Sequence, residues 1–180
     1  MSNETKLFDI KDTRTQMLFW FLERCQGVTQ SPKWHPEGDV FNHSIQVGLM
    51  AFKETNDIDL IISAYLHDVG KIILSQKHSK IGCILLTPYV SIKTIFLIEN
   101  HMRIWSYING EMKKQSKCQS LIGHPWLSEL IQLARFDHAG RNPNRKINYD
   151  RDRIIDGLNR CANEHFYLPE HLKETNETKE

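Results

Sequence analysis

The sequence lacks the features that mark several classes of protein. Its four cysteines are widely spaced and form no C-x-x-C pair, which excludes a disulfide framework or a thiolate zinc site and favours a reducing cytoplasm. The polar N-terminus, Met1 to Lys6, has no apolar segment of the secretory kind. Apolar runs such as 60–66 are too short to cross a bilayer. We therefore expect a cytoplasmic protein with no membrane partner.

Charge of one sign and internal repeats are also missing. The formal net charge is +1, so no global field attracts nucleic acid or membrane. The 180 residues fit one domain with one core. We expect a single domain at 6–172, with flexible tails at 1–5 and 173–180, because both ends are polar. Nine histidines, many of them near carboxylates, indicate metal or acid–base chemistry.

Strand-like alternation is rare and the apolar spacing is helical throughout, so the sequence predicts an all-α fold. The expected helices cover residues 15–25, 39–54, 57–68, 78–86, 91–101, 125–138 and 151–165. The almost continuous apolar run at 57–68 predicts the central buried helix. Gly70 follows it, where a helix end favours a positive φ. Residues 106–124 are polar and carry a turn signal at Asn109-Gly110.

One pair of adjacent ionisable residues ends the most apolar helix. Burial of His67 and Asp68 is costly unless a partner such as a divalent cation neutralises them. His43 shares its expected helix face with apolar side chains at i+4 and i+7, and Asp137 shares its face with those at i−7, i−4 and i−3. Four core-facing ligands from three helices predict a metal site within a helical bundle.

These residues resemble the HD superfamily of metal-dependent phosphohydrolases, and in particular the HD domain of bacterial tRNA nucleotidyltransferases, the CCA-adding enzymes. The matching stretches, in the expected order, are HPEGDVFNHS (35–44), AYLHDVGK (64–71), KHSKIG (77–82), ENHMR (99–103) and ARFDHAGR (134–141). An isolated His-Asp pair is a weak motif. The combination of HD-x-G-K, an upstream histidine and a downstream D-x-x-G-R is a strong one.

The resemblance implies a role for each matching residue. The metal ligands would be His43, His67, Asp68 and Asp137; the catalytic residues Asp68 and Lys71; the second-metal or phosphate contacts His78 and His101; and the substrate-binding residues Lys71, Arg103 and Arg141. The cofactor would be a divalent ion, such as Mn, Co, Ni, Fe or Zn, with Mg as an alternative. Only nine residues separate Asp68 from His78, and this short gap favours one ion over two.

The expected function is metal-activated hydrolysis of a phosphate ester, as a phosphomonoesterase, nucleotidase or cyclic phosphodiesterase. The substrate would be a phosphorylated small molecule, a nucleotide or the end of an RNA, and the protein a monomer or a homodimer. The printed sequence shows no nucleotidyltransferase head, so we do not expect CCA addition. Two alternatives are a metal-containing nucleotide- or RNA-binding module without turnover, and a di-iron oxygenase. The intact HD-x-G-K argues against the first, and the one-metal reading argues against the second.

Overall fold

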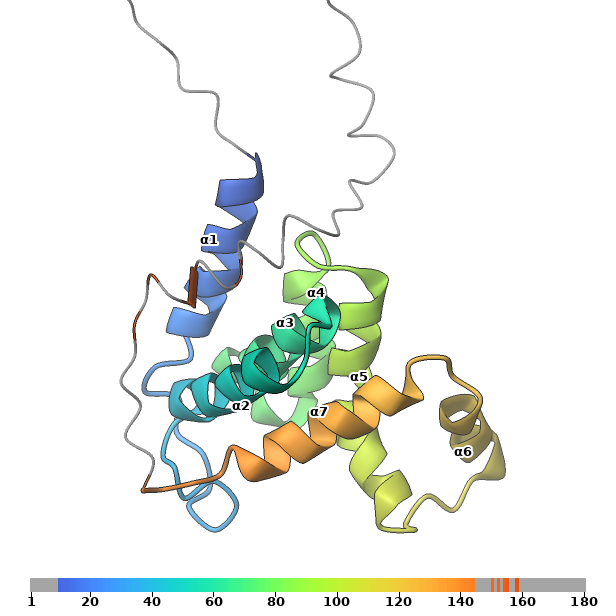
Figure 1. The fold of residues 1–180 in the computed structure, drawn as a ribbon. Helices are drawn as coiled ribbons and strands as arrows, with labels where there is room; N and C mark the ends of the chain where they lie inside the picture. The colour runs from blue at the N-terminus through green and yellow to red at the C-terminus, as the bar shows by residue number, and fades with distance from the viewer. Residues whose placement is uncertain (1–9, 145–149, 151, 153, 156–157, 159–180) are drawn as a thin grey trace, which may run out of the picture.

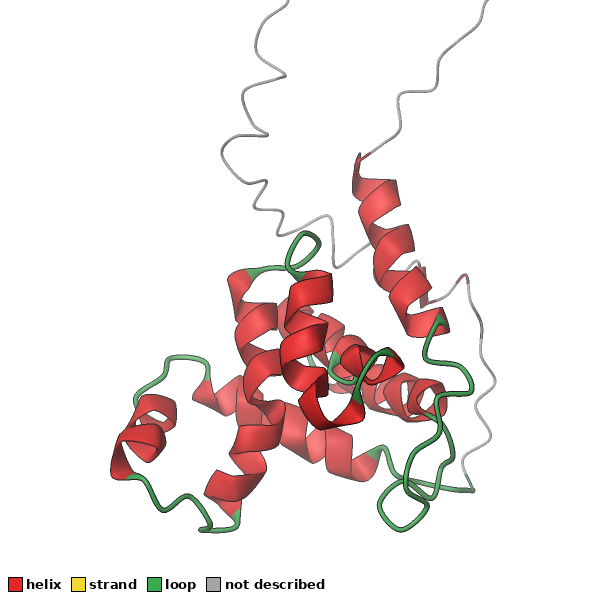
Figure 2. Ribbon diagram, turned by 180° about the vertical axis from the view of Figure 1, so that it is seen from behind, coloured by secondary structure: helices red, strands yellow, loops and turns green. Residues whose placement is uncertain are grey.

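The fold is built from helices alone in the part of the chain that the computed structural model describes, which is residues 10–144, 150, 152, 154–155 and 158 (Figures 1 and 2). The α-helices are α1 (Ile10–Glu23), α2 (Val40–Glu54), α3 (Ile58–Leu66), α4 (His78–Leu86), α5 (Ile92–Ile108), α6 (Gln115–Ile122) and α7 (Leu127–Ala139). Two short 3₁₀ helices, η1 (Val69–Ile72) and η2 (Ser75–Lys77), connect α3 to α4. These described residues contain no β-strand and one isolated bridge, between Thr29 and Asp39. The all-α prediction is confirmed.

The short helix α3 lies at the centre of the bundle, where it packs against α2, α5, α7 and α1 (Figure 1). Every residue from Leu60 to Leu66 is buried. A helix that is apolar on all sides can exist in a soluble protein only when other helices cover it. The prediction of a central buried helix is therefore confirmed. None of the described helices is both long enough and apolar enough to span a membrane.

Polar side chains fix the starts of the central helix α3 and of two helices packed against it, α2 and α5. Asp39 caps α2 by accepting from the backbone N–H of Asn42 at 2.8 Å, and Asp57 caps α3 through the N–H of Leu60 at 3.0 Å. Ser91 caps α5. Each cap satisfies one of the backbone donors that a helix start leaves free. Since helices start at defined residues, the side chains one to three turns further along lie at defined positions.

Several expected boundaries differ from the structure. Helix α1 begins at Ile10, five residues earlier than expected, and α5 continues past residue 101 to Ile108. The polar stretch 106–124 contains α6, which stands apart from the bundle in both views (Figures 1 and 2). Of the expected helix 151–165, residues 152, 154, 155 and 158 are helical, and the others lie outside the described residues. The tails 1–5 and 173–180 also lie outside them.

The expectation of a positive φ at Gly70 was wrong. Positive φ values occur among the described glycines at Gly27, Gly38 and Gly110, the last of which confirms the turn at Asn109-Gly110. At Gly70 the reason for glycine is close packing instead. A Cβ there would lie 2.0 Å from the carbonyl oxygen of His78. The missing side chain lets η1 lie directly against the start of α4.

Candidate metal centre

Four side chains expected to bind a metal meet inside the bundle. His43 comes from α2, His67 and Asp68 follow the end of α3, and Asp137 comes from α7. His43 Nε2 lies 3.1 Å from Asp137 Oδ1 and 3.9 Å from Asp68 Oδ2. His67 Nε2 lies 3.5 Å from the same Asp68 oxygen. All four residues are at most 4% exposed, so they form one buried cluster.

His67 leaves one ring nitrogen without a partner. Its Nδ1–H donates to the carbonyl oxygen of Ala64 at 3.1 Å, while the buried Nε2 has no hydrogen-bond partner among the described residues. Burial lowers the pKa of His67 to about 3, so the ring is neutral and carries a lone pair on Nε2. A histidine tied in this way at one nitrogen and free at the other fits a metal ligand.

The two carboxylates of the cluster are ionised. Burial alone would raise the pKa of Asp68 and of Asp137, because it penalises the charged form. Neighbouring groups outweigh this effect: the contact with His101 and the charges of Lys71 and His43 act on Asp68, and His43 acts on Asp137. The pKa of each carboxyl is well below its usual range. Ionised carboxylates and a bare imidazole nitrogen are the donors that divalent transition ions prefer. The residues present therefore fit such an ion.

A second group of imidazoles faces the other oxygen of Asp68. His78 Nε2 and His101 Nε2 lie 3.2 and 3.7 Å from Asp68 Oδ1, and 3.0 Å from each other. Each ring donates its Nδ1–H to a backbone carbonyl, of Ser75 or Ile98, at 2.6 Å. Two neutral rings held like this direct two lone pairs at each other, so a proton or a metal ion must lie between them. Burial lowers the pKa of His78, and Asp68, His78 and His101 form a group that could hold a metal ion.

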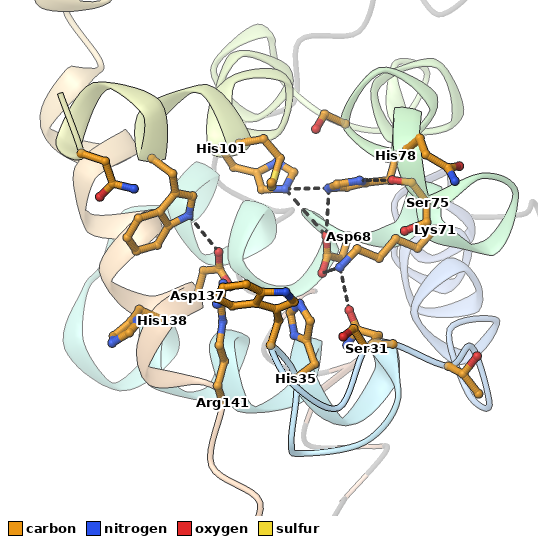
Figure 3. A pocket seen from close by; sticks show the side chains of 18 residues that line it. Ser31, His35, Asp68, Lys71, Ser75, His78, His101, Asp137, His138 and Arg141 are labelled. Carbon is orange, nitrogen blue, oxygen red and sulfur yellow. Dashed lines mark hydrogen bonds and ion pairs between the residues drawn. The ribbon is translucent and has the colours of Figure 1, made fainter. Parts of the chain in front are cut away.

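A pocket of about 750 Å³ opens onto both groups (Figure 3). Its lining includes Asp68, His78, His101, Asp137, Lys71, Arg141 and His35. Lys71 Nζ donates to Asp68 Oδ2 and to Gln30 Oε1, both at 2.6 Å. Arg141 Nη2 donates to Asp137 Oδ1 at 3.0 Å. Two cations thus stand beside the carboxylates at the pocket, where a phosphate group could meet them.

The carboxylate of Glu37 is a part of this site that the sequence analysis missed. It lies between His35 Nδ1, at 2.9 Å, and His43 Nδ1, at 2.7 Å. Burial opposes its ionisation, but the contacts with the two histidines lower the pKa of Glu37 to about 2. Burial likewise opposes the charged form of His43, yet Asp137 and Glu37 raise its pKa to about 9. The signal that pointed here was the start, HPEGD, of the matching stretch at 35–44.

Asp39 and Arg103 contact other parts of the chain. Asp39 caps α2 and also accepts from the N–H of Gly27 at 2.7 Å. Arg103 is exposed and does not belong to the described lining of the pocket. Its guanidinium donates to Asn100 Oδ1 at 2.6 Å and reaches Ser120 of α6 at 3.3 Å. Arg103 therefore connects α5 to α6. The other expected site residues lie together, in the buried cluster or in the lining of the pocket.

Comparison with known proteins agrees with this picture. The HD domain family matches residues 40–156, well over half of the chain, and the chain belongs to this family. Proteins of this family are generally metal-dependent phosphohydrolases. The chain is also similar to a "Multifunctional CCA protein" from Thioalkalivibrio sulfidiphilus (strain HL-EbGR7), with 40% identity over 55 residues. That stretch is 31% of this chain and 13% of the relative, so the chain matches only a small part of it. The resemblance drawn from the motifs is confirmed.

Proposed function

We propose that this protein hydrolyses a phosphate ester of a nucleotide or of a nucleic-acid end, using divalent metal ions held by its buried histidines and aspartates. One observation carries the proposal. A cluster of histidines and ionised aspartates, whose bare nitrogens fit a metal ion, lies at a pocket that also presents Lys71 and Arg141. A metal centre beside fixed positive charges suits the hydrolysis of an anionic ester.

The geometry supports two ions rather than one. His43, His67, Asp68 and Asp137 would hold the first, and Asp68, His78 and His101 would hold the second. The two oxygens of Asp68 face the two groups separately. The nine-residue gap before His78 is no obstacle, because η1 and η2 turn the chain back on itself within it. Manganese, iron, cobalt, nickel and zinc suit these donors best, and magnesium is the alternative.

These histidines and aspartates would hold a divalent ion, which would supply a water of lowered pKa and polarise a phosphoryl oxygen. The chain itself supplies the other parts of the reaction. Asp68 would orient the attacking water, because its carboxylate lies at the pocket between the two groups of histidines. Lys71 would neutralise charge that develops on the phosphoryl group, and Arg141 would hold phosphate oxygens in its planar fork.

The substrate class rests on two considerations. A pocket of about 750 Å³ falls in the range that holds a molecule of nucleotide size. The stretch shared with a "Multifunctional CCA protein" favours a nucleotide or an RNA end, although it covers 13% of that relative. The described cysteines, Cys25, Cys83 and Cys118, are free thiols, which suits the cytoplasm that we expect for this enzyme.

The test measures binding and turnover on the same protein. We would remove metal with a chelator, add back manganese, cobalt, nickel, zinc or magnesium, and count bound ions by elemental analysis. Phosphate release would then be assayed on nucleoside monophosphates, 2′,3′-cyclic nucleotides and simple phosphomonoesters. Asp68→Asn should abolish turnover, whereas Glu54→Gln, the same change in an exposed ion pair with Arg135, should not.

The expected result is two ions in the wild type, and one in His101→Ala. Turnover that depends on the added metal and disappears in Asp68→Asn would support a hydrolase, and the ranking of substrates would define its class. Tight metal binding with no turnover on any substrate would refute the hydrolase. It would support the alternative, a metal-containing module that binds nucleotide or RNA.

A further inference from the structure

Glu37 has an enclosed side chain although it lies in the loop before α2. Its carboxylate is 0% exposed. One oxygen, Oε1, contacts both His43 Nδ1 and His35 Nδ1, while the other, Oε2, is buried with no hydrogen-bond partner among the described residues. Burial of an ionised carboxylate costs free energy unless neighbouring groups stabilise its charge. The imidazoles of His35 and His43 are the neighbours that can do so.

The contact with His43 determines where that ring carries its proton. An ionised carboxylate oxygen has lone pairs only, so it repels a nitrogen 2.7 Å away unless that nitrogen carries an N–H, although this contact is not aligned as a full hydrogen bond. His43 therefore carries a proton on Nδ1. Its other nitrogen, Nε2, faces Asp137 Oδ1 at 3.1 Å, inside the cluster where a metal would lie. When the ring is neutral, Nε2 is the nitrogen with the free lone pair.

The other three histidines of the centre reach the same state by a different route. His67, His78 and His101 each direct Nδ1 to the backbone carbonyl of the residue three positions earlier. His43 directs Nδ1 to a carboxylate instead. A carboxylate is a charged acceptor, and it makes the ring to which it is bound a stronger base and a better metal ligand. Glu37 is thus a side-chain partner that mutation can remove, whereas the carbonyls are not.

We propose that Glu37 is a positioning residue for the metal centre, which holds His43 with its proton on Nδ1 and its Nε2 lone pair directed at the metal. This inference rests on the metal centre of the proposed function. Glu37 touches no reacting group itself, and it acts through His43. Its second contact, with His35 in the pocket lining, ties that side of the pocket to the same carboxylate.

A series of variants separates the two effects of Glu37. Glu37→Leu removes both the acceptor and the charge, and we expect metal affinity to fall about 10- to 100-fold, as for other carboxylates that support a metal ligand. Glu37→Gln keeps an oxygen at the same place and loses the charge, so its loss should be smaller. Glu54→Gln is the matched control for the loss of a carboxylate, because Glu54 pairs with Arg135 at the surface, and it should bind as the wild type does.

Two measurements test the series. Competition of the purified protein with a chelating dye gives the affinity for Zn²⁺ and Mn²⁺, and unfolding curves of the metal-free variants show whether each is folded. Nitrogen-15 spectra of the histidines, recorded over a series of pH values in the metal-free wild type, report which ring nitrogen of His43 carries the proton once the ring is neutral. We expect the spectra to show the proton on Nδ1 of His43. We expect metal affinity to be highest in the wild type, lower in Glu37→Gln and lowest in Glu37→Leu.

Other outcomes overturn this inference, and they differ from a failure of the metal centre. If Glu37→Leu is folded and binds metal as tightly as wild type, Glu37 is not a positioning residue. If His43 carries its proton on Nε2 in wild type, the inference fails even where Glu37→Leu does not fold. If Glu37→Leu loses one whole ion and Glu37→Gln loses it too, the His35, Glu37 and His43 group is itself a metal site, and the positioning role is wrong. A wild type that binds no metal refutes the proposed function, while the spectra still decide the tautomer.

Discussion

Replacing Gly70 with alanine should damage the metal centre without changing any of its ligands. Gly70 is part of η1, between Asp68 and Lys71 in the sequence. In space it packs against the start of α4. A Cβ at this position would meet only backbone atoms at short range: the carbonyl oxygen of His78 at 2.0 Å, Gly82 N at 2.7 Å and the carbonyl carbon of His78 at 2.8 Å. Backbone atoms of a helix cannot rotate away as the end of a side chain can.

The size of the effect follows from these distances. Real Cβ contacts are essentially never shorter than 3.0 Å, so η1 and α4 must separate by about 1 Å. The displacement falls on Lys71, which is next to Gly70, and on His78, which begins α4. Overpacking of this kind destabilises a fold by about 1–3 kcal/mol. A 1 Å misplacement of catalytic groups can lower a rate by about 10²-fold. We therefore expect Gly70→Ala to lower both the free energy of unfolding and the rate of the reaction.

Gly82→Ala is the matched control, since it adds the same methyl group on the opposite side of the same contact. Its Cβ would lie 3.4 Å from Val69 Cγ1 and 3.6 Å from Gly70 N, which is ordinary packing. Because Gly82 lies inside α4, Gly82→Ala should leave the free energy of unfolding unchanged or raise it by up to about 1 kcal/mol. Urea unfolding, metal affinity and kcat/KM would be measured for both variants. Wild-type values in Gly70→Ala for all three would refute the steric argument.

Four further predictions concern charge. Arg141→Met should raise KM for a phosphate ester about 10- to 100-fold, because it removes a charged donor from the pocket. Arg103→Met should leave kcat/KM unchanged and lower only the melting temperature, and steady-state kinetics with thermal unfolding would separate the two arginines. The metal-free protein should lose stability as the pH falls from about 6.5 to about 3, because the unfolded chain protonates His67 in this range and the folded chain does not. Urea unfolding should show a slope of at most about 1.4 kcal/mol per pH unit, and a slope that is the same in His67→Gln would contradict this assignment. Lys71→Met should reduce kcat in single-turnover assays and leave the number of bound ions at two, whereas loss of an ion would show that Lys71 supports the fold of the centre.

Much of the fold could be predicted from local patterns. The apolar run of α3 requires burial on all sides, and aspartate and serine at helix starts gave the beginnings of α2, α3 and α5. Helix α6 could not be predicted, because its sequence is polar and it buries Leu121 alone. Residues 102–108 were not expected to continue α5, although the Asn-Gly signal lies after them and nothing earlier stops the helix.

The site was predictable where a side chain had to face the core. His43 and Asp137 share helix faces with buried apolar residues, and this placed both inside the bundle. Glu37 could not be found in that way, because it lies in a loop, where spacing does not determine which way a side chain points. Arg103 lies outside the described lining of the pocket. A long side chain on an exposed face of α5 can reach several partners, and those of Arg103 are Asn100 on α5 itself and, at longer distances, Lys117 and Ser120 on α6.

The charges of the metal-free centre show why its stability and its function are linked. Three buried carboxylates, those of Glu37, Asp68 and Asp137, need positive partners. His43 with its raised pKa, Lys71 and Arg141 provide them, and Lys71 Nζ lies 2.6 Å from Asp68 Oδ2. In this state the two groups best placed to bind phosphate are engaged by aspartates. Any cation that satisfies the same carboxylates competes with Lys71 and Arg141 for them, and thereby makes both side chains available to an anionic substrate. The pocket should therefore bind inorganic phosphate more tightly in the metal-loaded protein than in the metal-free protein.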